Sequence, residues 1–366
     1  MGSARRAAGA GRRQRRPGGT GEVTSRLRLR WVAVGVVAVL VALVAGLAFG
    51  PVSLSPVDVV TDLVHHLTGG AVPTGLSARD DAILTQLRLP RVVLGLLVGA
   101  LLALSGGCYQ GVFRNPLADP YLLGVAAGAG LGATAVIVLR PGSTVTAPLL
   151  IPLAAFVGAL AAVAGTYLLG AAGARFRSTV TLILAGVAIA AFCTAIQTYL
   201  LQAHSDTIQE VYSWLLGQLT VSGWHEVLML LPYAVVTSVV VLSQRRALDV
   251  LSVGDEEAAS LGLHPQRVRL LLVLAATLGT AAAVAVSGLI GFVGIIVPHA
   301  VRLVAGSSYR IILPLSLLFG AAFLALADLL ARTVQAPAEI PIGVVTAFFG
   351  APFFVVVLRT TRRVAP

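Results

Sequence analysis

The chain has 366 residues, of which 57% are hydrophobic and 11% are charged, and its net charge is +11. Soluble globular domains are about 45–50% apolar and about 25% charged, so the composition argues against a water-soluble enzyme. At about 20 residues for each membrane-spanning helix, the chain can cross a bilayer about ten times. The sequence therefore predicts an all-α, polytopic integral membrane protein.

Residue counts exclude several kinds of active site. All 26 positive residues are arginine, so the chain lacks the lysine of a phosphate-binding P-loop and of Schiff-base catalysis. Cys108 and Cys193 lie in apolar runs, which suits core packing better than a disulfide or a metal site. No two histidines have HExxH spacing, and we interpret His65, His66 and His204 as ordinary surface residues. We expect no catalytic residue, and no metal or cofactor bound by this chain.

Residues 1–30 are rich in arginine and glycine and precede the first apolar run. A basic segment can bind nucleic acid, but directly before an uncharged segment it more simply marks the cytoplasmic side of a membrane. A cleaved signal peptide has the same layout, although the run 31–49 is longer than a usual signal sequence core. We predict a disordered cytoplasmic tail over 1–30, an uncleaved first helix, a membrane domain over 31–366, and no nucleic-acid partner.

Uncharged apolar runs follow one another along the rest of the chain. They are Trp31–Phe49, Val92–Phe113, Tyr121–Leu139, Pro148–Gly170, Thr179–Leu201, Val227–Leu242, Leu270–Val301, Ile311–Ala327 and Ile340–Leu358. The run 270–301 exceeds the length of one helix and contains Pro298, which removes a helix donor. Dividing this run near Gly288–Gly291 gives ten spans.

The distribution of arginine supports ten spans. With the N-terminus in the cytoplasm, ten spans place 21 arginines inside and five outside. Nine spans place 17 inside and nine outside, and the basic C-terminus then faces outward. Because cytoplasmic loops carry the excess of positive charge, ten spans are favoured. We therefore expect a multi-pass protein of the cytoplasmic membrane.

Three of the five outside arginines flank the second and ninth spans. Arg88 and Arg91 precede the second span, and Arg332 ends the ninth. One interpretation is that their side chains reach the interface, with Arg332 also pairing with Asp328 four residues earlier. The other is a cationic rim that receives an acidic partner at the outer face.

The polar segment 243–269 is predicted to be cytoplasmic. Within it, Ser252 to Gly262 has acidic residues where the helix dipole favours them, and Gly262 can supply a left-handed C-cap. The pattern predicts a short helix, which suits docking on another protein; a simple connector is the alternative.

Buried acidic residues are nearly absent from the predicted spans. Of fifteen acidic residues, only Asp328 lies clearly within an apolar span. Ion-coupled carriers usually need ionisable groups near the bilayer centre, so the energy source is expected outside this chain.

Four segments carry recognisable motifs. The first contains Leu87-Arg-Leu-Pro-Arg91, Ser105-Gly-Gly107 and Gln110-Gly-Val-Phe-Arg-Asn-Pro-Leu-Ala-Asp-Pro120, and the others cover 254–263, 288–302 and 339–353. Together they resemble the FecCD family, the permeases of ABC importers for iron–siderophore, haem and cobalamin. The resemblance covers about 31–360 and leaves out the tail.

The resemblance implies ten helices in each subunit and a pore of two subunits, either two copies or this chain with a sister permease. Two cytoplasmic ATPase subunits would use ATP and Mg²⁺, and an extracellular binding protein would deliver the substrate. Arg88, Arg91 and Arg332 match arginines that meet acidic residues of that binding protein. Residues matching the helix that sits in a groove of the ATPase are Gly254, Asp255, Glu256, Glu257, Ala258, Leu261 and Gly262.

Asn115, Leu117 and Thr179 match positions that line the cytoplasmic gate in similar permeases, although their small side chains also suit helix packing. The resemblance implies a non-catalytic importer subunit. We expect it to carry a ferric-siderophore chelate, because that is the commonest substrate in the family. Cobalamin or haem as the substrate, or an ion-gradient-driven secondary carrier, are the alternatives; an exporter or a scaffold would be further ones.

Overall fold

The computed structural model describes residues 27–50, 54–139, 147–172, 179–219 and 223–361, and all regular structure in these ranges is helical. Residues 1–26 of the predicted tail, with Arg140, Arg175 and Arg177, lie outside the described residues. Each of the ten predicted spans corresponds to one apolar helix. These helices are α1 (Leu29–Ala48), α4 (Leu89–Val112), α5 (Val125–Leu139), α6 (Ala147–Ala172), α7 (Thr179–Ala203), α9 (His225–Ser243), α12 (Pro265–Ser287), α13 (Val293–Ala305), α14 (Tyr309–Thr333) and α15 (Ile342–Thr361).

Among the described residues, seven helices are long and apolar enough to cross a membrane, and α5, α13 and α15 provide shorter apolar segments. The predicted break near Gly288–Gly291 is confirmed, because α12 ends at Ser287 and α13 begins at Val293. Gly288 (φ +67°) and Phe292 (φ +69°) have left-handed backbone there. The 13 residues of α13 extend for about 20 Å, which is shorter than the hydrocarbon core of about 30 Å.

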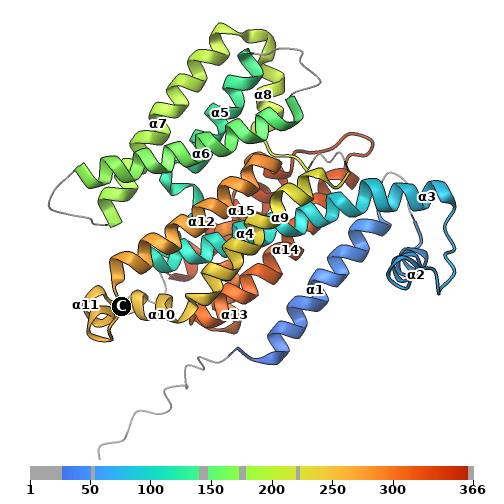
Figure 1. The fold of residues 1–366 in the computed structure, drawn as a ribbon, viewed down its shortest axis with the longest axis horizontal. Coiled ribbons are helices and arrows are strands. Elements are labelled where there is room, and N and C mark those ends of the chain that lie inside the picture. Colours follow the sequence, from blue (N-terminus) through green and yellow to red (C-terminus); the bar gives the residue numbers. More distant parts are fainter. Residues whose placement is uncertain (1–26, 51–53, 140–146, 173–178, 220–222, 362–366) are drawn as a thin grey trace, which may run out of the picture.

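Helix α4 forms the centre of the bundle (Figure 1). It packs against α1, α9, α12, α13 and α14, and 18 of its 24 residues are buried. Glycine permits these close approaches: a Cβ on Gly99 would meet the backbone of Gly320 in α14, and one on Gly106 would meet Gly294 in α13. Small residues let helix backbones pack closely in membranes, where apolar side chains alone do not drive association.

Helices α5, α6 and α7 form a second group beside this bundle (Figure 1). It joins the α4 group through the contacts of α12 with α5 and α6. The outer helices present large apolar side chains to the surroundings, as at Val37 of α1, Leu168 of α6 and Phe192 of α7. Apolar outer faces of this kind are those of a protein that spans a membrane.

Short helices occupy the two ends of the bundle. At one end α2 (Pro56–Leu67) and α3 (Ala78–Ile83) follow α1, and the π-helical turn Leu84–Arg88 leads into α4. We call this end the α3 end. The opposite end, about 36 Å away along the 24 residues of α4, carries α10 (Arg245–Val253) and α11 (Asp255–Ser260) (Figure 1). We call it the α11 end.

The segment 243–269 contains two short helices where one, from Ser252 to Gly262, was predicted. Leu248 and Leu251, three residues apart, are both buried, so α10 packs an apolar face on the bundle despite its charged residues. Gly254 has an extended backbone that separates α10 from α11. The acidic first turn of α11 and the left-handed Gly262 (φ +80°) are confirmed.

Candidate functional site

Two arginines at the α3 end hold the end of α1. The Arg88 Nη1 group donates hydrogen bonds to the carbonyl oxygens of Leu47 (2.6 Å) and Ala48 (3.3 Å), and Arg332 donates to the carbonyl of Gly46. The last carbonyls of a helix lack partners within the helix, and positive charge there complements the helix dipole. Both arginines are buried, at 7% and 4% relative exposure.

Arg91 joins α4 to α14 and to the connection that follows it. Its Nη2 atom lies 2.8 Å from the Asp328 Oδ1 atom and 2.8 Å from the Glu339 Oε2 atom. The hydrogen bond from Arg91 lowers the pKa of the Glu339 carboxyl. Asp328 also lies 3.3 Å from the Arg332 Nε atom, which confirms the predicted pair four residues apart on one helix.

The structure thus brings Arg88, Arg91 and Arg332 together at one end of the bundle. Their exposure differs, because only Arg91 reaches the surface, where it is paired with the half-exposed Glu339. Gly50 covers the other two: a Cβ there would lie 3.3 Å from guanidinium nitrogens of Arg88 and Arg332. Sequence reasoning quoted Glu339 only as part of a motif and missed this pairing, since 248 residues separate it from Arg91.

At the α11 end, Asp255 is the meeting point of three helices. Its carboxylate, in the first turn of α11, pairs with Arg114, just beyond α4, and with Arg269 of α12, whose Nη2 atom lies at 2.8 Å. Although burial alone would raise it, the hydrogen bonds and charges of Arg269 and Arg114 lower the pKa of the Asp255 carboxyl. Arg114 also donates to the carbonyl of Leu251 in α10 (2.8 Å).

The backbone around Arg114 is a Schellman motif. The N–H of Arg114 donates to Gly111, that of Asn115 donates to Gln110, and Arg114 has φ +51°. Glycine is the usual residue in this left-handed position, and an arginine there directs its side chain to Asp255. Sequence reasoning counted Arg114 among the cytoplasmic charges and quoted it within a motif, but gave it no role of its own.

The predicted gate residues Asn115 and Leu117 share the turn that follows. The Asn115 Oδ1 atom accepts a hydrogen bond of 3.0 Å from the N–H of Leu117, and the Leu117 side chain is partly exposed. Thr179 is the first residue of α7. Its side chain and the preceding segment 173–178 lie outside the part of the chain that the structure describes.

The outer face of α11 combines acidic and apolar side chains. Glu256 and Glu257 are exposed, Ala258 is buried against the bundle, and Leu261 directly after the helix is 70% exposed. Val253, directly before it, is 71% exposed. The outer face of α11 thus offers two exposed apolar side chains beside exposed carboxylates.

Comparison with known proteins agrees with this architecture. The model of the FecCD transport family matches residues 38–360. The cobalamin import system permease protein BtuC of Halobacterium salinarum is 45% identical over 285 residues, which cover 78% of this chain and 75% of that protein. The Fe(3+)-citrate import system permease protein YfmE of Bacillus subtilis is 37% identical over 327 residues, covering 89% and 94%.

The fold is also that of a solved transporter. The inward-facing structure of an ABC transporter assigned to the metal-chelate type has a TM-score of 0.79 and 29% sequence identity, and the match covers 91% of this chain and 100% of that one. Together with ten apolar helices, these matches establish a multi-pass permease of the cytoplasmic membrane. The chain belongs to the FecCD transport family, whose members are the non-catalytic transmembrane permease subunits of ABC importers.

Proposed function

We propose that this permease passes a ferric-siderophore chelate into the cell, using ATP hydrolysed by two separate ATPase subunits and substrate delivered by an extracellular binding protein. The single observation that supports an energy source outside this chain is the pairing of Asp328 with arginine. It is the one acidic side chain buried in the apolar helices that the structure describes, and both Arg91 and Arg332 pair with it. A carboxylate neutralised in this way is a poor site for a coupling ion, which disfavours a secondary carrier.

The proposal places the α11 end in the cytoplasm, together with both termini, and the α3 end outside. The ATPase docks on α11 through Glu256, Glu257 and Leu261. Movement of α11 reaches the Asn115–Leu117 turn through the Asp255–Arg114 pair, because Arg114 directly precedes that turn. The two permease subunits of the pore then rock against each other, which alternates access to the two sides. Either a second copy or a sister permease completes the pore.

The binding protein docks at the α3 end in this proposal. Its acidic lobes first meet Arg91, which is the accessible member of the arginine cluster and whose partner Glu339 is half exposed. A partner carboxylate can replace Glu339 on Arg91 without burying a new charge. Arg88 and Arg332 take part only when the end of α1 releases their guanidinium groups.

The relatives do not decide the substrate, because they include an iron-citrate permease and a cobalamin permease. Uptake tests it in a strain deleted for this gene, offered labelled ferric siderophores, haem and cobalamin in parallel, with and without vanadate. Loss of vanadate-sensitive siderophore uptake, restored by the gene, is the expected result. Loss of haem or cobalamin uptake alone would replace the proposed substrate, and restored uptake that resists vanadate would overturn the ATP-driven mechanism.

A further inference from the structure

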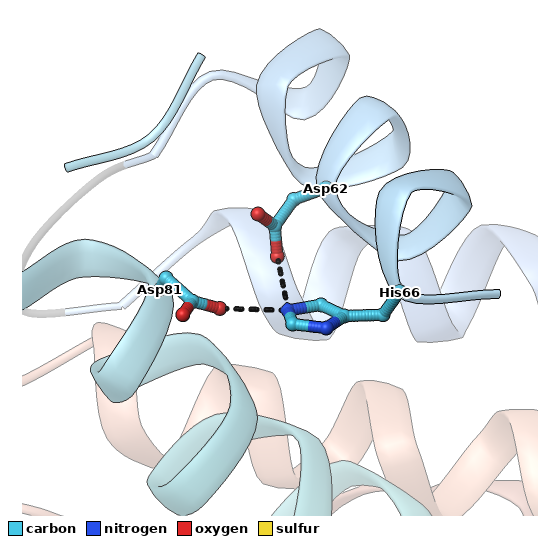
Figure 2. Close-up of side chains that lie close together, drawn as sticks. All are labelled: Asp62, His66 and Asp81. Atoms are coloured by element: carbon cyan, nitrogen blue, oxygen red, sulfur yellow. Dashed lines mark hydrogen bonds and ion pairs between the residues drawn. The ribbon is translucent and has the colours of Figure 1, made fainter. Parts of the chain in front are cut away.

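Three potential metal ligands meet between α2 and α3 at the α3 end (Figure 2). Asp62 and His66 are four residues apart on α2 and therefore share one face of that helix, and Asp81 comes from α3. The His66 Nε2 atom lies 2.9 Å from the Asp81 Oδ1 atom and 3.7 Å from the Asp62 Oδ2 atom. The three ligand atoms all lie within 4.8 Å of one another.

Asp62 is the unusual member of this cluster. Its side chain is completely buried, and its Oδ1 atom accepts a hydrogen bond of 2.6 Å from the Thr74 hydroxyl. The Oδ2 atom is also buried and accepts no hydrogen bond from the described residues; it faces the imidazole of His66 instead. A buried carboxylate oxygen without a donor is costly, so such atoms call for a partner.

A hydrogen bond with His66 does not supply that partner. The Nε2 atom carries at most one proton, and Asp81, at 2.9 Å, is the acceptor at hydrogen-bonding distance. The Asp62 Oδ2 atom, at 3.7 Å from Nε2, is too distant for a hydrogen bond. It would be stabilised only by the charge of a protonated imidazole. A cation between the three groups would satisfy both carboxylates at once.

The ligand atoms of this cluster, carboxylate oxygens and an imidazole nitrogen, favour some cations over others. Carboxylate oxygen together with imidazole nitrogen suits Zn²⁺ and its first-row neighbours, whereas Ca²⁺ and Mg²⁺ favour oxygen ligands alone. Bonds of about 2.0–2.2 Å in tetrahedral geometry separate ligand atoms by about 3.3–3.6 Å. The observed separations of 2.9 and 3.7 Å lie on either side of that value. Two carboxylates and a neutral imidazole also balance the charge of a divalent cation.

We propose that Asp62, His66 and Asp81 bind one divalent transition-metal cation, with Zn²⁺ preferred, and that this cation fastens α2 to α3 at the α3 end. Water completes the coordination. The site is a resident one and separate from the transported chelate. Because α3 runs through the turn Leu84–Arg88 into α4, a fastened α2–α3 pair would hold the surface next to Arg91 in one arrangement.

Metal binding by the purified, full-length permease tests this inference without any transport assay, so it fails or succeeds independently of the proposed function. The protein is purified in detergent through a tag that contains no histidine, stripped with EDTA and titrated with Zn²⁺. Wild type is expected to bind one equivalent and to unfold at a higher temperature when Zn²⁺ is present. Co²⁺ is expected to give the visible absorption of a low-coordinate site, which Zn²⁺ abolishes.

The variants His66→Gln and Asp81→Asn are expected to weaken Zn²⁺ binding at least tenfold and to lose the Zn²⁺-dependent rise in unfolding temperature. Both side chains are partly exposed, so these variants are expected to fold; Asp62→Asn, a buried change, is the third variant. The matched controls are Asp80→Asn, at the residue directly before Asp81, and His204→Gln, at an exposed histidine elsewhere. Both should bind Zn²⁺ like wild type. Absence of binding by wild type, or binding that survives His66→Gln and Asp81→Asn, overturns the proposal and leaves a plain His–Asp ion pair.

Discussion

Arg114 and Asp255 form an ion pair that joins the end of α4 to the first turn of α11, and Arg114 directly precedes the turn that holds Asn115 and Leu117. A surface ion pair of this kind adds little to stability, with a median of about 0–1 kcal/mol. Its position is what matters, because it links the helix proposed to contact the ATPase to the turn proposed to gate the pore.

Breaking this pair should separate ATP hydrolysis from transport. Arg114→Gln and Asp255→Asn are each expected to lower substrate uptake per ATP hydrolysed several-fold, while ATPase activity and thermal stability stay close to wild type. Reconstituted transporter in proteoliposomes gives both rates. Arg267→Gln, an exposed charge in the same segment, is the control. Equal coupling ratios in all three variants would show that the pair has no part in transmission.

The exposed face of α11 should carry the affinity for the ATPase. Leu261→Ala removes an apolar side chain that is 70% exposed in the isolated chain, and Glu256→Lys reverses a charge beside it. We expect each change to weaken ATPase binding about tenfold, the effect of losing about 1.4 kcal/mol at an interface. Affinity is measured by light scattering or by co-purification, and Ser260→Ala on the same helix is the control. Unchanged affinity would reduce α11 to a connector.

Docking of the binding protein should depend on Arg91 and be limited by Glu339. Arg91→Glu is expected to weaken docking at least tenfold at low salt and less at high salt, because ions screen exposed charges. Glu339→Gln should strengthen docking, since it removes the carboxylate that competes for Arg91. Surface plasmon resonance on the permease in nanodiscs measures both, with Arg79→Glu, exposed on α3, as the control. If Arg91→Glu binds like wild type, the docking surface lies elsewhere.

Arg332 should contribute to stability whatever its role in docking. Its guanidinium is buried and holds both the Gly46 carbonyl and Asp328, so Arg332→Gln leaves these groups short of a partner. Removing one member of a buried pair costs about 3–5 kcal/mol. We expect the free energy of unfolding to fall by that amount or somewhat less, because Arg91 still pairs with Asp328. Thermal unfolding in detergent checks this, and Arg332→Lys, which keeps the charge, should recover part of the loss. An unchanged unfolding temperature would contradict the buried pairing.

The connection between α4 and α5 should make stability depend on pH. Burial raises the pKa of Asp119 to about 6, and the hydrogen bond from the N–H of Tyr121 offsets only part of this rise. Between the ordinary value of 3.8 and about 6, the folded chain therefore binds a proton that the unfolded chain has released. Stability should fall as the pH rises through this window, by as much as about 3 kcal/mol.

Asp119→Asn isolates that contribution, because its side-chain oxygen can still accept from Tyr121 while the charge is gone. Relative to wild type, this variant should be more stable at neutral pH and should show a smaller change across the window. Unfolding is followed in detergent at a series of pH values, with the exposed Asp206→Asn as the control. Parallel pH profiles for wild type and Asp119→Asn would show that Asp119 keeps an ordinary pKa.

Local sequence patterns were sufficient to predict where the ten apolar helices lie along the chain. The break between Ser287 and Val293 and the left-handed Gly262 were also predictable, because hydropathy, helix caps and glycine conformation act over a few neighbouring residues. The short helices α2, α3, α8 (Ile208–Leu215) and α10 were not predicted. Their apolar stripes are only a few residues long and are mixed with charges.

Only the tertiary structure decided which charges meet. The sequence placed Arg88, Arg91 and Arg332 at the ends of spans, but not the burial of two of them under the end of α1. It counted Arg114 as one cytoplasmic charge among many and treated His66 as an ordinary surface residue. Those roles depend on partners at a distance along the chain, 141 residues from Arg114 to Asp255 and 15 from His66 to Asp81. Hydrophobic burial is a property of each segment, whereas an ion pair exists only after packing has brought two segments together.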